Sequence, residues 1–347
     1  MAGETSEQTF GQLVDIRQLL TPQGIKVAAR RYISNPFSTE VSRNGEDFVG
    51  KQATLHDLEE SIASNGIVVL EGGHSTGKTA LLKIAVARLV EKGAATVSHY
   101  VSLESISMVE PIDFEREIVD GIVRRKRKIN FARKKAVIAL DEIESLGTHQ
   151  RVDEFVAGIS VLRNQGHQIL IGIIGDIHAK GDIDGELNAH AKQQLISLVH
   201  DSVVVNPLFT DDETRQAVSG NPQMFTDKII NYLVKEAGGH PRLAKVLAAQ
   251  LFQILEGIRK GFIQIPFHYV IDRLKDDMAE KHLSAFFPIV VDNVIAAGYN
   301  PLTWQYTGKP ENRPDERVYR NMLPGESSTI FKEWLMAYLE KRSQSSS

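Results

Sequence analysis

The sequence lacks cysteine altogether, which excludes disulfide scaffolds, zinc ribbons, iron–sulfur clusters and cysteine nucleophiles. It also lacks a long hydrophobic run, since apolar stretches such as Ile67–Leu70 and Ala136–Leu140 are far too short to cross a bilayer. The N-terminus shows neither the basic nor the apolar region of a signal peptide. We therefore expect no membrane partner and a cytoplasmic protein, or a nuclear one if the source is eukaryotic.

A strong excess of one charge is missing as well. Forty Lys and Arg residues stand against 44 Asp and Glu residues, for a net charge of −4. A nucleic-acid partner would consequently need a local basic patch. The 347 residues, 42% hydrophobic and 24% charged, instead fit an ordinary globular protein of about two domains.

Short apolar segments alternate with segments of helical spacing between residues 48 and 207. The expected strands are Ile67–Leu70, Thr96–Ser102, Ala136–Leu140, Ile169–Ile174 and Ser202–Val205. The expected helices are Lys78–Glu91, Phe114–Val123, Arg151–Arg163 and Glu186–Val199. This alternation predicts an α/β fold, a three-layer sandwich with a parallel five-stranded sheet. After Pro207 the pattern becomes helical, beginning with a capping box formed by Thr210 and Glu213.

Residues 72–79 read Gly-Gly-His-Ser-Thr-Gly-Lys-Thr, the pattern of a phosphate loop, and lie between an expected strand and an expected helix. The glycines let the loop curl so that backbone N–H groups point at phosphate oxygens, and the helix N-terminus favours negative charge. Lys78 is expected to reach the β- and γ-phosphates and Thr79 to coordinate Mg²⁺. The expected ATP-binding residues here are Gly72, Gly73, His74, Ser75, Thr76, Gly77, Lys78, Thr79 and Ala80.

An acidic pair follows the apolar segment 136–140, in the manner of a Walker B strand. Asp141 is expected to hold Mg²⁺ through water. Glu142 is the expected general base, so that Glu142 and Lys78 are the two catalytic candidates. An acidic helix cap would have the same sequence, but the phosphate loop favours the functional interpretation. In this topology the next strand lies beside the phosphate loop, and Asp176 at its end either contacts the nucleotide or is a solvated turn residue.

Two further segments complete a resemblance to a known family. They are Asn35-Pro36-Phe37 with Phe48-Val49-Gly50-Lys51, and Gly238-Gly239-His240-Pro241-Arg242. With the phosphate loop and the acidic pair, they make the chain resemble P-loop ATPases of the AAA+/STAND superclass, such as archaeal-type STAND ATPases and origin-recognition-type AAA+ proteins, over about residues 35–255.

The resemblance implies roles for residues outside the phosphate loop. Val49 and Gly50 would lie against the adenine, with Lys51 nearby, and Pro241 would pack on the base from a helical lid. Arg242 would act on the phosphates. A plain Gly-Pro helix start is the alternative for the lid motif. We accordingly expect an N-terminal arm or helical prefix over 1–47, a P-loop core over 48–207, a helical lid over 208–260 and a mostly helical region over 261–347 with a disordered tail.

One departure from the family concerns arginine. Between Ile177 and Asp201, where ring-forming AAA+ motors usually carry an arginine finger, the sequence has none. This favours a nucleotide-controlled switch over a hexameric motor.

A basic run occupies residues 124–135, where eight of twelve residues are Lys or Arg. It precedes the Walker B strand and so belongs to the sheet edge opposite the nucleotide. A nucleic-acid contact, a nuclear-import patch, an acidic protein partner and a solvated helix end all remain open. The residues concerned first are Arg124, Arg125, Lys126, Arg127 and Lys128.

These observations together predict a slow or partner-stimulated ATPase that uses ATP and Mg²⁺ and acts as a conformational or assembly switch on a protein partner or on itself. A DNA-acting AAA+ ATPase, such as an origin-type loader or a transposition helper, is the first alternative. The second is a nucleotide-binding adaptor without significant hydrolysis, against which Glu142 argues.

Overall fold

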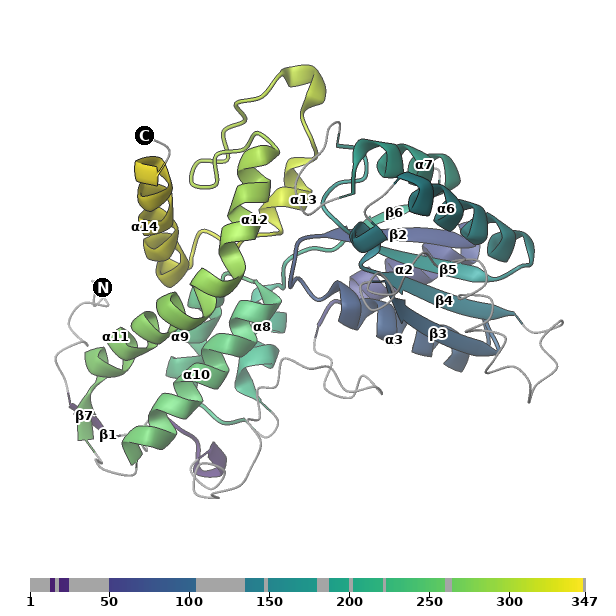
Figure 1. The fold of residues 1–347 in the computed structure, drawn as a ribbon. Coiled ribbons are helices and arrows are strands. Elements are labelled where there is room, and N and C mark those ends of the chain that lie inside the picture. The colour runs from purple at the N-terminus through teal and green to yellow at the C-terminus, as the bar shows by residue number, and fades with distance from the viewer. Residues whose placement is uncertain are drawn as a thin grey trace, which may run out of the picture. The chain divides into compact units, whose positions relative to one another are not determined.

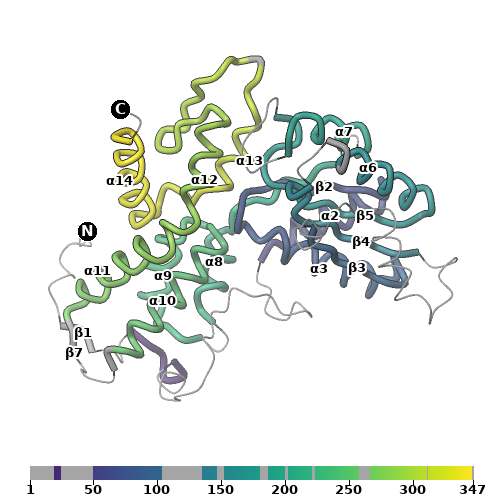
Figure 2. The backbone as a smooth tube through the Cα atoms, in the orientation of Figure 1, coloured from purple at the N-terminus to yellow at the C-terminus, as the bar shows by residue number. Residues whose placement is uncertain are grey.

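The chain forms two compact units in a computed structural model (Figures 1 and 2). Unit 1 comprises Met1–Val41, Leu208–Ile289 and Leu323–Ser347, and unit 2 comprises Ser42–Pro207 and Val290–Met322. The structure describes residues 13–15, 19–24, 50–103, 135–146, 149–179, 187–199, 202–220, 223–259 and 264–345.

Unit 2 is built on a five-stranded sheet in which every neighbouring pair is parallel. Its strands are β2 (Ile67–Gly72), β3 (Val97–Ser102), β4 (Ala136–Asp141), β5 (Gln168–Ile174) and β6 (Val203–Val205), in the order β3-β4-β5-β2-β6. The parallel sheet is confirmed, and so is the expectation that β5 lies beside the strand of the phosphate loop.

Helices cover both faces of this sheet, which makes the predicted three-layer sandwich (Figure 1). α2 (Gln52–Asn65) and α3 (Lys78–Glu91) pack on one face, and α6 (His149–Asn164) and α7 (Ala189–Val199) pack on the other. The short 3-10 helix η5 (Ile143–Leu146) follows β4. The expected helix Phe114–Val123 lies outside the described residues.

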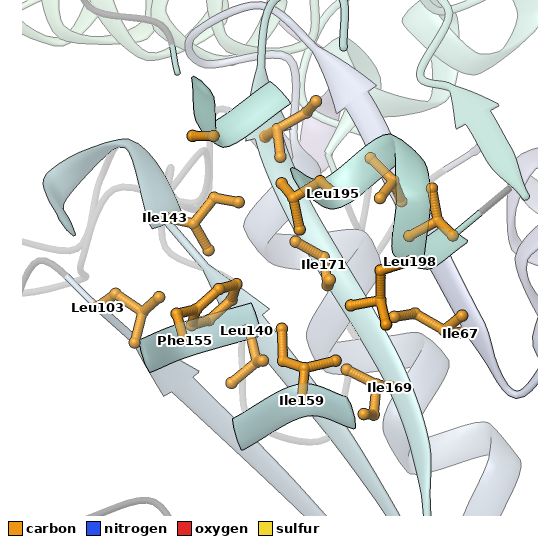
Figure 3. Packing of buried hydrophobic residues seen from close by; sticks show 14 of the residues in the cluster. Ile67, Leu103, Leu140, Ile143, Phe155, Ile159, Ile169, Ile171, Leu195 and Leu198 are labelled. Atoms are coloured by element: carbon orange, nitrogen blue, oxygen red, sulfur yellow. The ribbon is translucent and has the colours of Figure 1, made fainter. Parts of the chain in front are cut away.

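A hydrophobic core cluster of unit 2 lies between the sheet and α6 and α7 (Figure 3). Ile169 and Ile171 of β5 meet Phe155 and Ile159 of α6 and Leu195 of α7, and all five are at most 1% exposed. Burial of each such side chain contributes about 1.5–3 kcal/mol to the free energy of folding. Because the strands are parallel, their carboxyl ends, which carry the polar residues, lie at one edge of the sheet.

Unit 1 is mostly helical. Its helices are α8 (Asp211–Ser219), α9 (Asp227–Ala237), α10 (Pro241–Arg259), α11 (Phe267–Asp277), the π-helix η6 (Met278–Leu283) and α14 (Thr329–Ser345). The predicted capping box is present, since Glu213 N donates to Thr210 Oγ1 over 3.2 Å and Thr210 N donates to Glu213 Oε2 over 2.9 Å.

Two details of the ends differ from expectation. Within the segment expected to be an N-terminal arm or helical prefix, Leu13–Asp15 form strand β1, which pairs antiparallel with β7 (Gln264–Pro266). The C-terminal tail, expected to be disordered, continues α14 as far as Ser345. The strand β1 forms only by pairing with β7, which is far away in the sequence. A three-residue strand also shows too little alternation of apolar and polar residues to be predicted on its own.

The segment 290–322 belongs to unit 2, although the residues on either side of it belong to unit 1. The chain enters this segment within α12 (Ser284–Ala296), continues through η7 (Pro310–Asn312) and ends it just after α13 (Glu316–Arg320). Among the described residues, no helix combines the length and the apolar composition needed to cross a membrane.

Candidate nucleotide site

The phosphate loop joins β2 to α3, as its sequence predicts. Gly77 caps α3 with a φ of 93°, in the left-handed region that residues with a side chain rarely adopt. Thr76 is fully buried and donates its hydroxyl to the carbonyl of Gly73 over 2.9 Å. The loop is thus held in its curl by its own side chains.

Lys78 lies folded into this loop. Its ammonium donates to the carbonyl oxygens of Gly72 and Gly73 over 3.0 and 2.6 Å. Burial lowers the pKa of Lys78, and the nearby carboxylates of Glu144, Asp141 and Glu142 oppose that shift in this order. The ammonium is therefore a desolvated charge that a phosphate group could compensate better than carbonyl oxygens do.

The two expected Mg²⁺ ligands lie in direct contact. Thr79 Oγ1 donates to Asp141 Oδ2 over 2.6 Å, and the hydroxyl of Tyr100 donates to the same carboxylate oxygen over 2.8 Å. Burial and the charge of Asp141 raise the pKa of Tyr100, which keeps this donor protonated. A hydroxyl beside a carboxylate at a phosphate loop is the oxygen donor set that Mg²⁺ prefers, so these residues fit the ion.

A glycine on the neighbouring strand makes room for this carboxylate. A Cβ on Gly172 of β5 would lie 2.7 Å from Asp141 Oδ1 and 2.8 Å from Leu82 Cδ1. The sequence reading missed this position, because the contact joins two strands whose pairing is needed to see it.

Glu142 follows β4 in a left-handed backbone conformation, with a φ of 61°. Such a conformation costs a residue with a side chain about 1–2 kcal/mol. Its carbonyl accepts from the backbone N–H and the hydroxyl of Ser145, which fixes the turn into η5. Its carboxylate accepts a hydrogen bond from the hydroxyl of Ser102 at the end of β3. Strained backbone held by its surroundings is a recurrent feature of active sites.

Glu144 is a third carboxyl group near Lys78 and was not singled out from the sequence. Its carboxylate accepts a hydrogen bond from the backbone N–H of Ile174 at the end of β5. Burial raises its pKa to about 7, while the Ile174 N–H and the charge of Lys78 act in the other direction. Its position two residues beyond the acidic pair carries no motif that would have indicated it.

Lys51 forms a second bond network around the loop. Its buried ammonium donates to the carbonyl of Thr76 over 2.8 Å, to Asn206 Oδ1 over 2.5 Å and to the carbonyl of Pro207 over 2.7 Å. Asn206 also donates to the carbonyl and the hydroxyl of Thr76. Lys51 therefore ties the phosphate loop to the end of β6, which is a role that sequence reasoning missed.

The expected adenine-facing residues are described only in part. Gly50 is buried and has a φ of 81°, directly before Lys51. Val49 and Asn35-Pro36-Phe37 lie outside the described residues, as does the basic run Arg124–Lys128. The adenine contact of Val49 and Gly50 stays a prediction.

Asp176 lies just beyond β5 and is 2% exposed. Its Oδ1 accepts from the backbone N–H of His178 over 2.7 Å, and its Oδ2 accepts from the backbone N–H of Asp315 over 2.8 Å. The structure thus uses this carboxylate to join β5 to the C-terminal part of unit 2.

The expected lid motif lies in unit 1, where Pro241 begins α10. Gly238 and Gly239 permit close backbone approaches, because a Cβ on them would lie 2.5 Å from Gly325 N and 2.6 Å from Phe209 O. The guanidinium of Arg242 lies over the ring of Phe286, 3.5 Å from its centroid, and burial lowers its pKa. The nucleotide contacts of Pro241 and Arg242 stay predictions.

No protein-family model and no curated protein matches the chain. Similar solved structures include domain III of the replication initiation protein DnaA of Thermotoga maritima, with 16% identity and a TM-score of 0.48 over 69% of this chain and 98% of that one.

The RuvB Holliday junction branch migration motor of Thermotoga maritima has 14% identity and a TM-score of 0.47 over 86% of this chain and 90% of that one. A Walker-type ATPase of Pyrococcus abyssi has 14% identity and a TM-score of 0.47 over 85% and 93%. At these low identities and TM-scores, the assignment of roles rests on the residues of this chain.

Replacing Lys51 by Met should destabilise the phosphate loop. The methionine keeps the length of the side chain but leaves the acceptors of Thr76, Asn206 and Pro207 without their shared donor, and an unsatisfied buried group costs about 1–3 kcal/mol. Urea denaturation should show this loss. The same replacement at Lys332, exposed on α14, should change stability by less than about 0.5 kcal/mol.

Replacing Lys78 by Ala should abolish or greatly weaken ATP binding, since the loop loses the charge that meets the phosphates. Calorimetric titration with ATP and Mg²⁺ measures this, and a melting curve of the variant controls for its fold. ATP affinity equal to that of the wild type would refute the assignment of the phosphate loop.

Proposed function

We propose that this chain is an ATP-binding, Mg²⁺-dependent ATPase that acts as a nucleotide-controlled switch. The observation that carries the proposal is the meeting of Lys78, Thr79, Asp141 and Glu142 at the carboxyl edge of one parallel sheet. Thr79 and Asp141 are in hydrogen-bond contact there, 2.6 Å apart.

Each residue has a distinct part in the reaction. Lys78 exchanges its bonds to Gly72 and Gly73 for the β- and γ-phosphates, and loop N–H groups bind the remaining phosphate oxygens. Thr79 and Asp141 would hold Mg²⁺, which neutralises phosphate charge. Glu142 orients a water and accepts its proton as the water attacks the γ-phosphate.

The bonding of Glu142 supports slow or partner-stimulated turnover. The carboxylate of Glu142 already accepts from the hydroxyl of Ser102, so it must give up that hydrogen bond to reach an attacking water. A partner or a nucleotide that moves β3 relative to β4 would release it.

The switch part of the proposal rests on the resemblance to AAA+ and STAND ATPases and on one feature of the sequence. The absence of arginine between Ile177 and Asp201 argues against a ring motor with an arginine finger at its usual place. In a switch, ATP favours one of two conformations, and hydrolysis returns the protein to the other. The partner that reads the conformation is a protein or a second copy of the chain.

The replacement Glu142→Gln should preserve ATP binding and abolish hydrolysis. The amide keeps the shape of the side chain and its bond to Ser102, but it does not take up a proton. Phosphate release under single-turnover conditions measures the effect, alongside Glu60→Gln on the exposed face of α2 as the matched control. Hydrolysis at the wild-type rate would mean that another group is the base.

A DNA-acting ATPase is the second candidate, and the basic run favours it. If Arg124, Arg125, Lys126 and Arg127 contact a nucleic-acid backbone, binding should weaken steeply with salt, by about 0.9 in the log–log slope per phosphate on duplex DNA. Replacing the four residues by Ala should lower that slope by several units and leave the DNA-independent ATPase rate unchanged. No binding of the wild type to DNA or RNA at low salt, with ATP present, would exclude this candidate.

A further inference from the structure

A short C-terminal segment packs on the phosphate-loop side of unit 2. This docked segment, Asp315–Met322, consists of the residue that caps α13, the helix itself and the two residues after it. α13 packs against β2, the strand that leads into the phosphate loop (Figure 1). Val318, Tyr319 and Met322 are at most 1% exposed, so the segment is anchored by apolar side chains.

The first anchor of the docked segment is the phosphate loop itself. A Cβ on Gly73 would lie 2.5 Å from Met322 Cγ and 2.8 Å from both its Cα and its Cβ. The φ of Gly73 lies outside the left-handed region, so its backbone does not demand glycine. The lack of a side chain at position 73 is explained by the approach of Met322.

The second anchor is the carboxylate of Asp176, which accepts from the backbone N–H of Asp315 over 2.8 Å. Asp176 follows β5, the neighbour of β2 in the sheet. The docked segment therefore contacts the residues that follow two adjacent strands, Gly73 after β2 and Asp176 after β5. The side chain of Asp315 is engaged with Arg317, which lowers the pKa of Asp315, so the backbone N–H alone makes the bond to Asp176.

Gly73 contacts both the docked segment and Lys78. The carbonyl of Gly73 accepts from Lys78 Nζ over 2.6 Å and from Thr76 Oγ1 over 2.9 Å, while the other side of Gly73 packs on Met322. A triphosphate must draw Lys78 away from this carbonyl. The peptide that Met322 braces is therefore one that nucleotide binding has to disturb.

We propose that the docked segment is an autoinhibitory latch. Its packing on Gly73 and its bond to Asp176 stabilise the arrangement in which Lys78 is bonded to the loop carbonyls, and so oppose nucleotide binding. This inference rests on the proposed function. Linkage requires the reverse effect as well: a nucleotide that binds the loop must weaken the docking of the segment by the same factor.

The latch has a direct covalent route to unit 1. Unit 1 resumes at Leu323, directly after Met322, and two residues further on the N–H of Gly325 donates to the carbonyl of Gly238 in the GGHPR motif over 2.7 Å. Release of the docked segment would loosen the chain that leads into this bond. Nucleotide occupancy would then affect unit 1 through the covalent connection after Met322 as well as through the connection after Pro207.

The test compares Asp315→Pro with Asp315→Ala in the full-length chain. Both variants lose the side-chain cap and the ion pair with Arg317, but only the proline loses the N–H that donates to Asp176. The φ of Asp315 is −66°, which a proline ring adopts without strain. Calorimetry with a non-hydrolysable ATP analogue and Mg²⁺ should show at least about tenfold tighter binding by Asp315→Pro than by Asp315→Ala.

A second variant and a second readout make the test independent of the proline. Met322→Ala should also bind the analogue more tightly than the wild type, whereas Met322→Leu, which keeps an apolar side chain of similar size, should not. Hydrogen exchange of peptides that cover residues 313–322 should speed up in the wild type when the analogue is added.

The outcomes separate the latch from the proposed function. Binding of equal affinity by Asp315→Pro, Asp315→Ala and Met322→Ala, with unchanged exchange of the segment, overturns the latch and leaves the ATPase proposal standing. Weaker binding by Asp315→Pro than by Asp315→Ala overturns it too, because the segment would then support the nucleotide. No binding by the wild type or by any variant overturns both.

Discussion

A desolvated ammonium group is the constraint on which the site depends. Lys78 is 8% exposed, and burial alone would favour its neutral form. The charged form is stabilised by hydrogen bonds to loop carbonyls and by the nearby carboxylates of Glu144, Asp141 and Glu142. The sheet order is what makes this possible, since β4 and β5 bring these groups to the end of β2. The same carboxylates would repel a triphosphate unless the lysine and a divalent cation lay between them. Thr79 and Asp141 are the residues that could hold such a cation.

The parts of the structure that sequence predicts well are those in which neighbouring residues determine the outcome. β4 and β5 are continuous apolar runs, buried on both faces, and the phosphate loop needs its glycines, its lysine and its threonine at fixed spacing. The capping box of α8 is equally local. What the sequence left out joins distant residues: Lys51 with Asn206, Gly172 with Asp141, and Asp315 with Asp176. No pattern within one segment announces such a pair, because each partner satisfies ordinary local preferences.

The same reasoning explains why the C-terminal region was hard to place. Its residues 290–322 join the P-loop unit, and the residues on either side of them join the helical unit. From the sequence, consecutive residues are assigned to the same region, so we expect one C-terminal region to begin at residue 261. Folding instead groups residues by the surface that they bury, and Val318, Tyr319 and Met322 bury theirs within unit 2. The result is a fold in which the C-terminal segment bears on the phosphate loop without belonging to its motif.

The GGHPR motif shows how packing and function can share residues. Its two glycines are accounted for by close approaches to Gly325 and Phe209 within unit 1, so they need no nucleotide to explain them. Arg242 is different, because a cation stacked on Phe286 gains about 0.5–2 kcal/mol, whereas hydrogen bonds to a charged group gain about 1.5–3 kcal/mol each. A guanidinium that pairs with a phosphate through two such bonds would therefore leave the ring. Burial lowers the pKa of Arg242, which reflects the cost of holding a guanidinium charge partly away from water. Arg242 thus has a packing partner within unit 1, whereas Lys78, Thr79 and Asp141 gather an ammonium, a hydroxyl and a carboxylate at one edge of the sheet, which packing alone does not explain.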